Sequence, residues 1–124
     1  MSRIHLSIVV PAFNEERRIA STLDSLLEHY HDRMSKTEIL VVDDGSTDRT
    51  AEVVQWHRRK TYRIKLLQVP HGGKGAAVRF GVEHAHGDFV FLCDADLGDC
   101  VSQLDKLESA LIAGADVAIG SRWI

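Results

Sequence analysis

Apolar and polar residues alternate along the chain in a pattern of short strands and amphipathic helices. Five apolar runs, rich in β-branched or aromatic residues, have the length of strands and are bounded by turn residues. They cover residues 6–11, 38–42, 64–69, 89–93 and 116–119. We therefore expect five strands.

Segments with helical spacing lie between the expected strands. Apolar residues recur every three or four positions from Ile19 to Tyr30, which is the pattern of a helix that buries one face. Later segments repeat this pattern, and each is preceded by a residue that can cap or open a helix. The expected helices follow Asn14, Ser46 or Thr47, the glycine-rich turn at 72–75, and Ser102.

The alternation of strands and helices predicts an α/β fold. Connections between parallel strands are right-handed, so the helices are expected on both faces of the sheet. We expect residues 1–124 to form one three-layer αβα domain with a mainly parallel, Rossmann-like sheet. In such sheets, ligands lie beyond the carboxyl ends of the strands, where the strand order reverses.

Polar or conformationally permissive residues follow every expected strand. They are Phe13, Asn14 and Glu15, then Asp43 and Asp44, Lys74 in its glycine-rich turn, Asp94 and Asp96, and finally Arg122. Because the carboxyl ends of parallel strands share one edge, we expect these side chains to lie close together. This convergence favours a binding site over a set of unrelated surface turns.

Asp94 and Asp96 end the fourth strand, with the small residue Ala95 between them. In extended backbone, residues two apart point to the same side, so both carboxylates face one point. Taken alone, two aspartates with this spacing more often form an acidic surface turn. Their hard oxygen ligands, however, suit Mg²⁺ or Mn²⁺ carrying substrate phosphates. With Lys74 and Arg122 as cations, the pattern predicts a metal-diphosphate site.

Composition and charge narrow the function classes. The chain has 44% hydrophobic and 27% charged residues and a net charge of −3, which is typical of a globular domain and argues against general nucleic-acid binding. It has no apolar run of the roughly 20 residues that span a bilayer and no signal-peptide cleavage site. We expect a cytoplasmic protein, peripheral to a membrane at most, with Cys93 and Cys100 reduced. The P-loop and the dinucleotide-binding glycine pattern are both absent.

Five ordered motifs resemble those of family 2 glycosyltransferases, which have the GT-A fold. The motifs are VVPAFNEE at 9–16, VVDDGSTD at 41–48, GKG at 73–75, DADL at 94–97 and GSR at 120–122. Together they span essentially the whole chain and are most similar to those of polyprenyl- or dolichyl-phosphate hexose synthases. Gly98 stands where some mannosyl members carry a glutamine, which favours the glucosyl branch.

The resemblance implies roles for individual residues. It implies a nucleoside pocket lined by Pro11, Ala12, Phe13, Glu15, Val42 and Asp44. It also implies that Asp94, Ala95 and Asp96 meet the diphosphate, with Asp94 and Asp96 binding Mg²⁺ or Mn²⁺. Lys74 and Arg122 would lie near phosphate and, with Asp96, would carry catalysis.

The implied reaction is inverting transfer of a hexose from a UDP- or GDP-hexose donor to a polyprenyl or dolichyl phosphate. A lipid phosphate is already ionised near neutral pH and needs no general base, whereas a sugar hydroxyl needs one. Asp99 is a weak candidate for such a base, and a helix cap is the stronger interpretation of this residue. Two alternatives stay open: transfer to a sugar or polysaccharide hydroxyl, and a donor-binding fragment without turnover.

Members of the resembled family continue for roughly as long again beyond the fifth strand. We therefore expect residues 1–124 to be the nucleotide-sugar-binding half of a longer catalytic domain. Such a half would bind donor but turn over poorly, because catalysis needs a positioned acceptor and exclusion of water. Trp123 and Ile124 would lack cover in this half, which favours self-association through this end, while the lipid phosphate acceptor favours peripheral contact with a membrane.

Overall fold

The structure is a computed structural model that describes residues 3–95, 104–107 and 109. Four strands, β1 (Leu6–Ala12), β2 (Thr37–Asp44), β3 (Ile64–Val69) and β4 (Phe89–Leu92), pair in parallel to form one sheet. The helices before β4 are α1 (Ile19–His29), the short 3₁₀ helix η1 (His31–Lys36), α2 (Thr50–Arg58) and α3 (Lys74–Glu83), and residues 104–107 are helical as well. The predicted strand at 116–119 lies outside the described residues.

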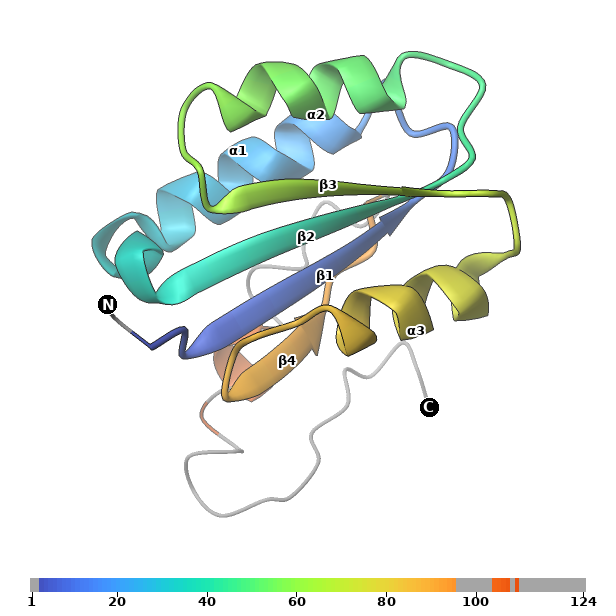
Figure 1. Ribbon diagram of the computed structural model, residues 1–124. Helices are drawn as coiled ribbons and strands as arrows, with labels where there is room; N and C mark the ends of the chain where they lie inside the picture. Colours follow the sequence, from blue (N-terminus) through green and yellow to red (C-terminus); the bar gives the residue numbers. More distant parts are fainter. Residues whose placement is uncertain (1–2, 96–103, 108, 110–124) are drawn as a thin grey trace.

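The strand order is β3-β2-β1-β4, so the order reverses beside β1. The chain builds outward from β1 to β3 and then crosses back to place β4 on the other side of β1 (Figure 1). The carboxyl ends of β1 and β4 therefore flank the switch point at which α/β sheets bind their ligands.

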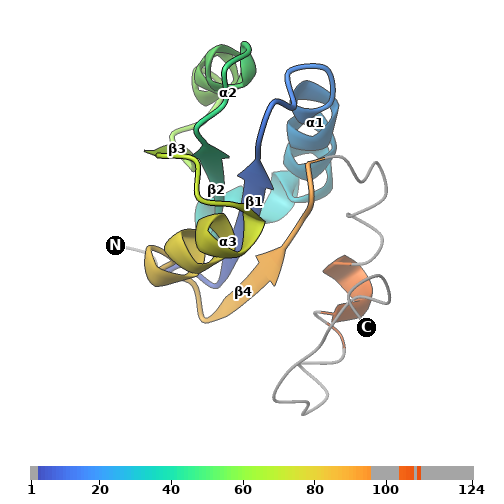
Figure 2. The same cartoon turned by 90° about the vertical axis from the view of Figure 1, so that its right-hand side faces the viewer.

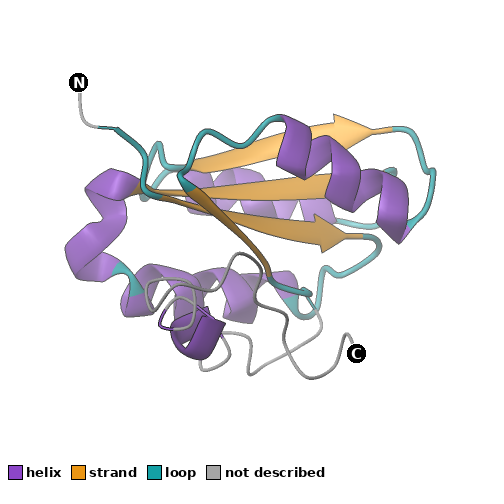
Figure 3. Cartoon of the chain, turned by 90° about the horizontal axis from the view of Figure 1, so that it is seen from below, coloured by secondary structure: helices purple, strands orange, loops and turns teal. Residues whose placement is uncertain are grey.

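Helices cover both faces of the sheet, which confirms the three-layer α/β fold. The helices α1 and α2 lie on one side and α3 on the other, as seen toward the strand ends in Figure 2 and from below in Figure 3. Ile8 and Val10 of β1 belong to the core cluster under α1, whereas Val9 packs in a second cluster with Ala77 of α3. Alternate residues of β1 thus pack into the cores on opposite faces of the sheet, which explains why the apolar run of this strand is continuous.

The helix α3 packs directly against Val9 and Val42 of the sheet at a glycine, Gly81. A Cβ atom at Gly81 would lie 2.5 Å from Cγ1 of Val9 and 3.0 Å from Cγ2 of Val42. Only a residue without a side chain fits this position without shifting the strands. This contact sets the height of α3, and therefore the height of the turn that precedes it.

Two helices begin later than predicted. The helix α1 starts at Ile19 rather than directly after Asn14, and Asn14 has a left-handed φ of 53°. Its side-chain oxygen accepts a hydrogen bond from the Thr47 N–H at 2.9 Å, while its own N–H donates to the Ser46 hydroxyl at 2.9 Å. These side chains join two loops instead of capping the helices α1 and α2.

The strand β4 is one of the two edge strands of the described sheet, and β3 is the other. Phe91 is buried, while the other three residues of β4 are only half-buried. Cys93, just after β4, is disulfide-bonded, which corrects the expectation that it is reduced. The chain's other cysteine, Cys100, lies outside the described residues.

Helices in the described part of the chain are too short or too polar to cross a bilayer.

Candidate active site

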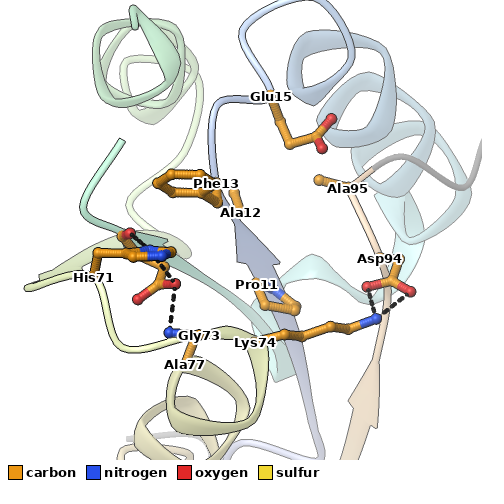
Figure 4. Close-up of a pocket in the computed structure, with 11 residues that line it drawn as sticks. Pro11, Ala12, Phe13, Glu15, His71, Gly73, Lys74, Ala77, Asp94 and Ala95 are labelled. Atoms are coloured by element: carbon orange, nitrogen blue, oxygen red, sulfur yellow. Dashed lines mark hydrogen bonds and ion pairs between the residues drawn. The ribbon is translucent and has the colours of Figure 1, made fainter. Parts of the chain in front are cut away.

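A pocket of about 270 Å³ opens at the carboxyl edge of the sheet, beside the switch point (Figure 4). Its lining comes from all four strand ends. The lining residues are Pro11, Ala12, Phe13, Glu15, Asp44, His71, Gly73, Lys74, Ala77, Asp94 and Ala95. The structure therefore brings together residues that are as much as 84 positions apart in the chain, from Pro11 to Ala95.

Asp44, at the end of β2, holds the turn that opens α3. Its carboxylate accepts hydrogen bonds from the Gly72 N–H at 2.8 Å and from the Gly73 N–H at 3.0 Å. The ring nitrogen Nδ1 of His71 lies 3.0 Å from the same carboxylate. The Asp44 side chain is only 4% exposed, so water competes little for these contacts, and they hold the turn against the end of β2.

Phe13 and His71 form an aromatic pair at the rim of the pocket. Their rings are stacked, with centroids 4.3 Å apart and planes inclined by 30°. This spacing leaves no room for a base between them, so His71 covers one face of Phe13. A nucleobase that stacks on this pair must use an outer face.

Lys74 and Asp94 face each other across the pocket (Figure 4). The Lys74 ammonium lies 2.7 Å from both Oδ1 and Oδ2 of the Asp94 carboxylate. The Asp94 side chain is 16% exposed and the Lys74 side chain 49% exposed. The charge of this largely covered carboxylate is thus balanced by a half-exposed lysine ammonium.

The donor set fits a hard divalent cation that is shared with a ligand. No group of three His, Cys, Asp or Glu side chains that could hold a metal by itself exists among the residues the structure describes. Mg²⁺ and Mn²⁺ are commonly held by one or two carboxylates together with substrate phosphates, so Asp94 beside an open pocket suits this role. Asp96, the second predicted ligand, lies outside the described residues.

Hydrogen bonds between two loops shape the side of the pocket near Glu15. The Glu15 N–H donates to the Thr50 hydroxyl at 2.9 Å, and the Glu16 N–H donates to Asp48 at 3.2 Å. Burial raises the pKa of Asp48, but hydrogen bonds from the Thr50 hydroxyl and N–H outweigh it and hold that pKa below 3.8. Asp48 therefore stays ionised at neutral pH and keeps the loops joined.

Two further predicted site residues are placed differently or not described. Val42 is fully buried in the cluster beneath α3 and is not part of the pocket lining. Arg122, like Asp96, lies outside the described residues.

The sequence analysis missed His71, which both stacks on Phe13 and contacts Asp44. A signal for it existed, since His71 directly follows the third strand and Pro70, at the same edge as the other candidates.

Comparison with known proteins identifies relatives of this chain. The model of the family described as "Glycosyl transferase family 2" matches residues 7–124. Dolichyl-phosphate beta-glucosyltransferase ALG5D of Trichomonas vaginalis is 40% identical over 115 residues, covering 88% of this chain and 35% of the relative. Dolichol-phosphate mannosyltransferase of Pyrococcus furiosus is 35% identical over 123 residues, covering 96% and 33%. The chain thus spans about a third of the length of these curated relatives.

Solved structures share the architecture. S. aureus TarS in complex with UDP superposes with a TM-score of 0.69 at 30% identity, covering 85% of this chain and 33% of TarS. Glucosyl-3-phosphoglycerate synthase from Mycobacterium tuberculosis, in complex with Mn²⁺, UDP and glucosyl-3-phosphoglycerate, gives 0.73 at 28% identity, covering 91% and 41%. The mannosyltransferase PcManGT from Pyrobaculum calidifontis, in complex with GDP-Man and Mn²⁺, gives 0.68 at 29%, covering 77% and 28%.

Proposed function

Because the chain belongs to glycosyl transferase family 2, we propose that residues 1–124 form the nucleotide-sugar-binding domain of an inverting, metal-dependent hexosyltransferase. The proposed acceptor is a polyprenyl or dolichyl phosphate. The observation that carries this proposal is the meeting of Asp44, Lys74 and Asp94, from three different strand ends, around one pocket. One nucleoside diphosphate could touch all three.

The pocket supports a division of roles along the donor. Phe13 and His71 offer an outer aromatic face for the base, and Glu15 lies beside them on the pocket wall. The turn held by Asp44 presents Lys74, at the N-terminus of α3, toward the diphosphate. A helix N-terminus and an ammonium both favour an anion at this point.

Asp94 and Asp96 would hold the divalent cation, Mg²⁺ or Mn²⁺. When bound, this ion would neutralise the charge that develops on the departing diphosphate. Lys74 would add a second positive charge there, and Arg122 a third if it reaches the same phosphates.

The proposed transfer of the hexose to a lipid phosphate needs no general base. The bond from the anomeric carbon to the diphosphate oxygen breaks, while an oxygen of the lipid phosphate forms the new bond from the opposite face of the sugar. A lipid phosphate monoester is ionised near neutral pH, so the attacking oxygen carries no proton that must be removed. A sugar hydroxyl acceptor would require a base.

The names of relatives support the acceptor class and leave two donors to be tested. One relative is a dolichyl-phosphate glucosyltransferase and another a dolichol-phosphate mannosyltransferase. Structural neighbours are complexes with UDP in two cases and GDP-Man in another. Gly98 favours the glucosyl branch, and therefore a UDP-hexose donor. Because the chain spans about a third of these relatives, donor binding without turnover is the second candidate function.

The test is calorimetric titration of the chain with UDP and with GDP, each with and without Mn²⁺. We expect one nucleotide to bind with Mn²⁺, and Asp94→Asn to weaken that binding about tenfold because the variant loses an anionic metal ligand. Asp96→Ala should weaken it in the same way. Asp105→Asn is the matched control, because it makes the same chemical change at a side chain that is 54% exposed and pairs with His29.

Binding that needs no metal and is unchanged in both Asp94→Asn and Asp96→Ala would contradict the assigned roles. Transfer to a polyprenyl phosphate, or hydrolysis of the donor by this chain, would rule out the candidate function without turnover. Transfer to sugar hydroxyls but not to lipid phosphate would contradict the proposed acceptor.

A further inference from the structure

We propose that Lys74 is an internal counter-ion of Asp94 that competes with the divalent cation for this carboxylate. The donor diphosphate would draw Lys74 away and so help the metal to bind. This inference rests on the proposed function, because it assigns a regulatory step to the same site.

The geometry places the ammonium where a metal would bind. The Nζ atom of Lys74 lies 2.7 Å from each oxygen of Asp94, so it bridges the carboxylate symmetrically. A divalent ion coordinated by this carboxylate needs the same open side of the two oxygens. Two cations cannot share this position, because they would repel each other at contact distance.

Among the three pocket carboxylates, Asp94 is the one whose negative charge is paired with Lys74. Glu15 has an arginine partner, since its Oε2 lies 3.3 Å from a guanidinium nitrogen of Arg18. Asp44 is held by the backbone N–H groups of the turn and by His71. The described part of the structure therefore shows three pocket carboxylates with three different partners, and only the partner of Asp94 is a flexible ammonium.

The anchor of Lys74 is fixed while its tip can move. Its backbone starts α3, directly after the turn that Asp44 holds through Gly72 and Gly73. The lysine side chain has a flexible stem of four carbons, and here it is about half exposed, at 49%. The ammonium can therefore exchange one anionic partner for another without movement of the backbone.

This exchange predicts opposite effects on two ligands. Without donor, Lys74 neutralises Asp94 and weakens metal binding. When a diphosphate enters, it offers the ammonium a new anionic partner and frees Asp94 for the metal. Removing the lysine charge should therefore strengthen binding of metal alone and weaken binding of nucleotide alone. A lysine that merely braced the turn would, when removed, weaken both.

The experiment measures Mn²⁺ binding without nucleotide, from the electron paramagnetic resonance signal of free Mn²⁺, for the whole chain and for Lys74→Met. Nucleotide binding is measured by calorimetry with UDP or GDP in EDTA. Arg79→Met is the matched control, because it removes one positive charge from the same helix at a side chain that is 84% exposed. Circular dichroism confirms folding of each variant, and Lys74→Gln serves if Lys74→Met does not fold.

We expect Lys74→Met to bind Mn²⁺ about fivefold more tightly than the wild-type chain, which is the upper range for a partly exposed ion pair. We expect its affinity for the nucleoside diphosphate in EDTA to fall about fivefold or more. Arg79→Met should change neither affinity by as much as twofold, because exposed charges at a distance are screened.

Unchanged or weaker Mn²⁺ binding in Lys74→Met, with wild-type binding of Mn²⁺ and nucleotide intact, would overturn the competition and leave the proposed function standing. Loss of both affinities in the variant would show a structural role instead. If the wild-type chain binds neither Mn²⁺ nor a nucleoside diphosphate, the proposed function and this inference are both overturned.

Discussion

Three acidic side chains show how neighbours decide what a carboxylate does. Asp44 is held by backbone N–H groups and fixes a turn, whereas Asp94 is paired with the half-exposed Lys74 ammonium and faces a pocket. Glu38 is fully buried on β2, near the amino ends of the strands and therefore away from the pocket. Its carboxylate accepts hydrogen bonds from the Ser7 hydroxyl and the His86 N–H, both at 2.6 Å, and from the Lys65 ammonium at 3.0 Å.

The surroundings of Glu38 predict a pH-dependent contribution to stability. Burial raises its pKa, but the hydrogen bonds from Ser7, His86 and Lys65 outweigh burial and hold the pKa below its ordinary value of 4.5. The folded state therefore binds this proton less readily than the unfolded state. The stabilisation is present above about pH 4.5 and is lost as pH falls through the lower, folded-state pKa.

We expect Glu38→Gln to lower the free energy of unfolding by about 2 kcal/mol at pH 7, because an amide cannot accept from all three donors. The loss should shrink as pH falls from 4.5 through the lower, folded-state pKa, because proton uptake by the wild-type carboxylate then favours the unfolded state. Urea denaturation between pH 3 and pH 7 measures both effects. Glu83→Gln, at a side chain that is 61% exposed, should change little, and an equal loss in both variants would contradict the prediction.

Among the secondary-structure elements, α3 links the core to the site. Gly81 lets it lie against Val9 and Val42, while its first residue, Lys74, reaches Asp94 across the pocket. A change in packing in the last turn of α3 is therefore expected to shift the first residue of the helix as well. The helical period of this segment was visible in the sequence, but its close approach to the sheet was not, because a glycine in a helical pattern equally signals a weak point.

We expect Gly81→Ala and Gly75→Ala to have opposite effects on stability. Alanine gains about 1 kcal/mol of helix propensity at either position. At Gly81 the added Cβ would lie 2.5 Å from Cγ1 of Val9, and the crowding should cost about 1–3 kcal/mol, giving net destabilisation. At Gly75 the added Cβ would meet no atom within 4 Å apart from its chain neighbours and the backbone of its own helix, so this variant should be neutral or more stable. Chemical denaturation measures both variants, and a more stable Gly81→Ala would refute the packing argument.

The loops after β1 and β2 behave as one unit. Asn14, Glu15 and Glu16 bond to Ser46, Thr47, Asp48 and Thr50 of the second loop. Ser, Thr, Asp and Asn next to a helical pattern are correctly treated as cap candidates, since these side chains bond to nearby backbone. Here the nearest unsatisfied backbone groups belong to another loop, which a local pattern cannot indicate.

In the molecule as a whole, the pocket joins all four described strand ends, so ligand binding and folding are coupled. We expect the matching nucleoside diphosphate with Mn²⁺ to raise the free energy of unfolding by about 2.7 kcal/mol at 100 times its dissociation constant. Urea denaturation with UDP or GDP, with Mn²⁺ or EDTA, measures this and identifies the preferred base.

The corresponding nucleoside monophosphate is the control, and it should stabilise much less because it offers fewer oxygens to Lys74 and the metal. Equal stabilisation by monophosphate and diphosphate would place the ligand away from Lys74 and Asp94.

Much of the architecture was already readable in the chain, because strand and helix periods and turn residues act over short distances. The strand at Ile64–Val69 agrees with its prediction, and the α/β class followed from the alternation of elements. The motifs pointed to the correct family, since they record the chemistry of strand ends.

Contacts between distant residues required the folded chain. The stack of Phe13 on His71, the hold of Asp44 on Gly72, and the pairing of Lys74 with Asp94 join residues 58, 28 and 20 positions apart. The placement of Val42 under α3 depends in the same way on which face of β2 the helix covers. Such contacts are set by strand order and helix packing, which arise from the competition of many weak interactions across the whole domain and leave no local pattern in the sequence.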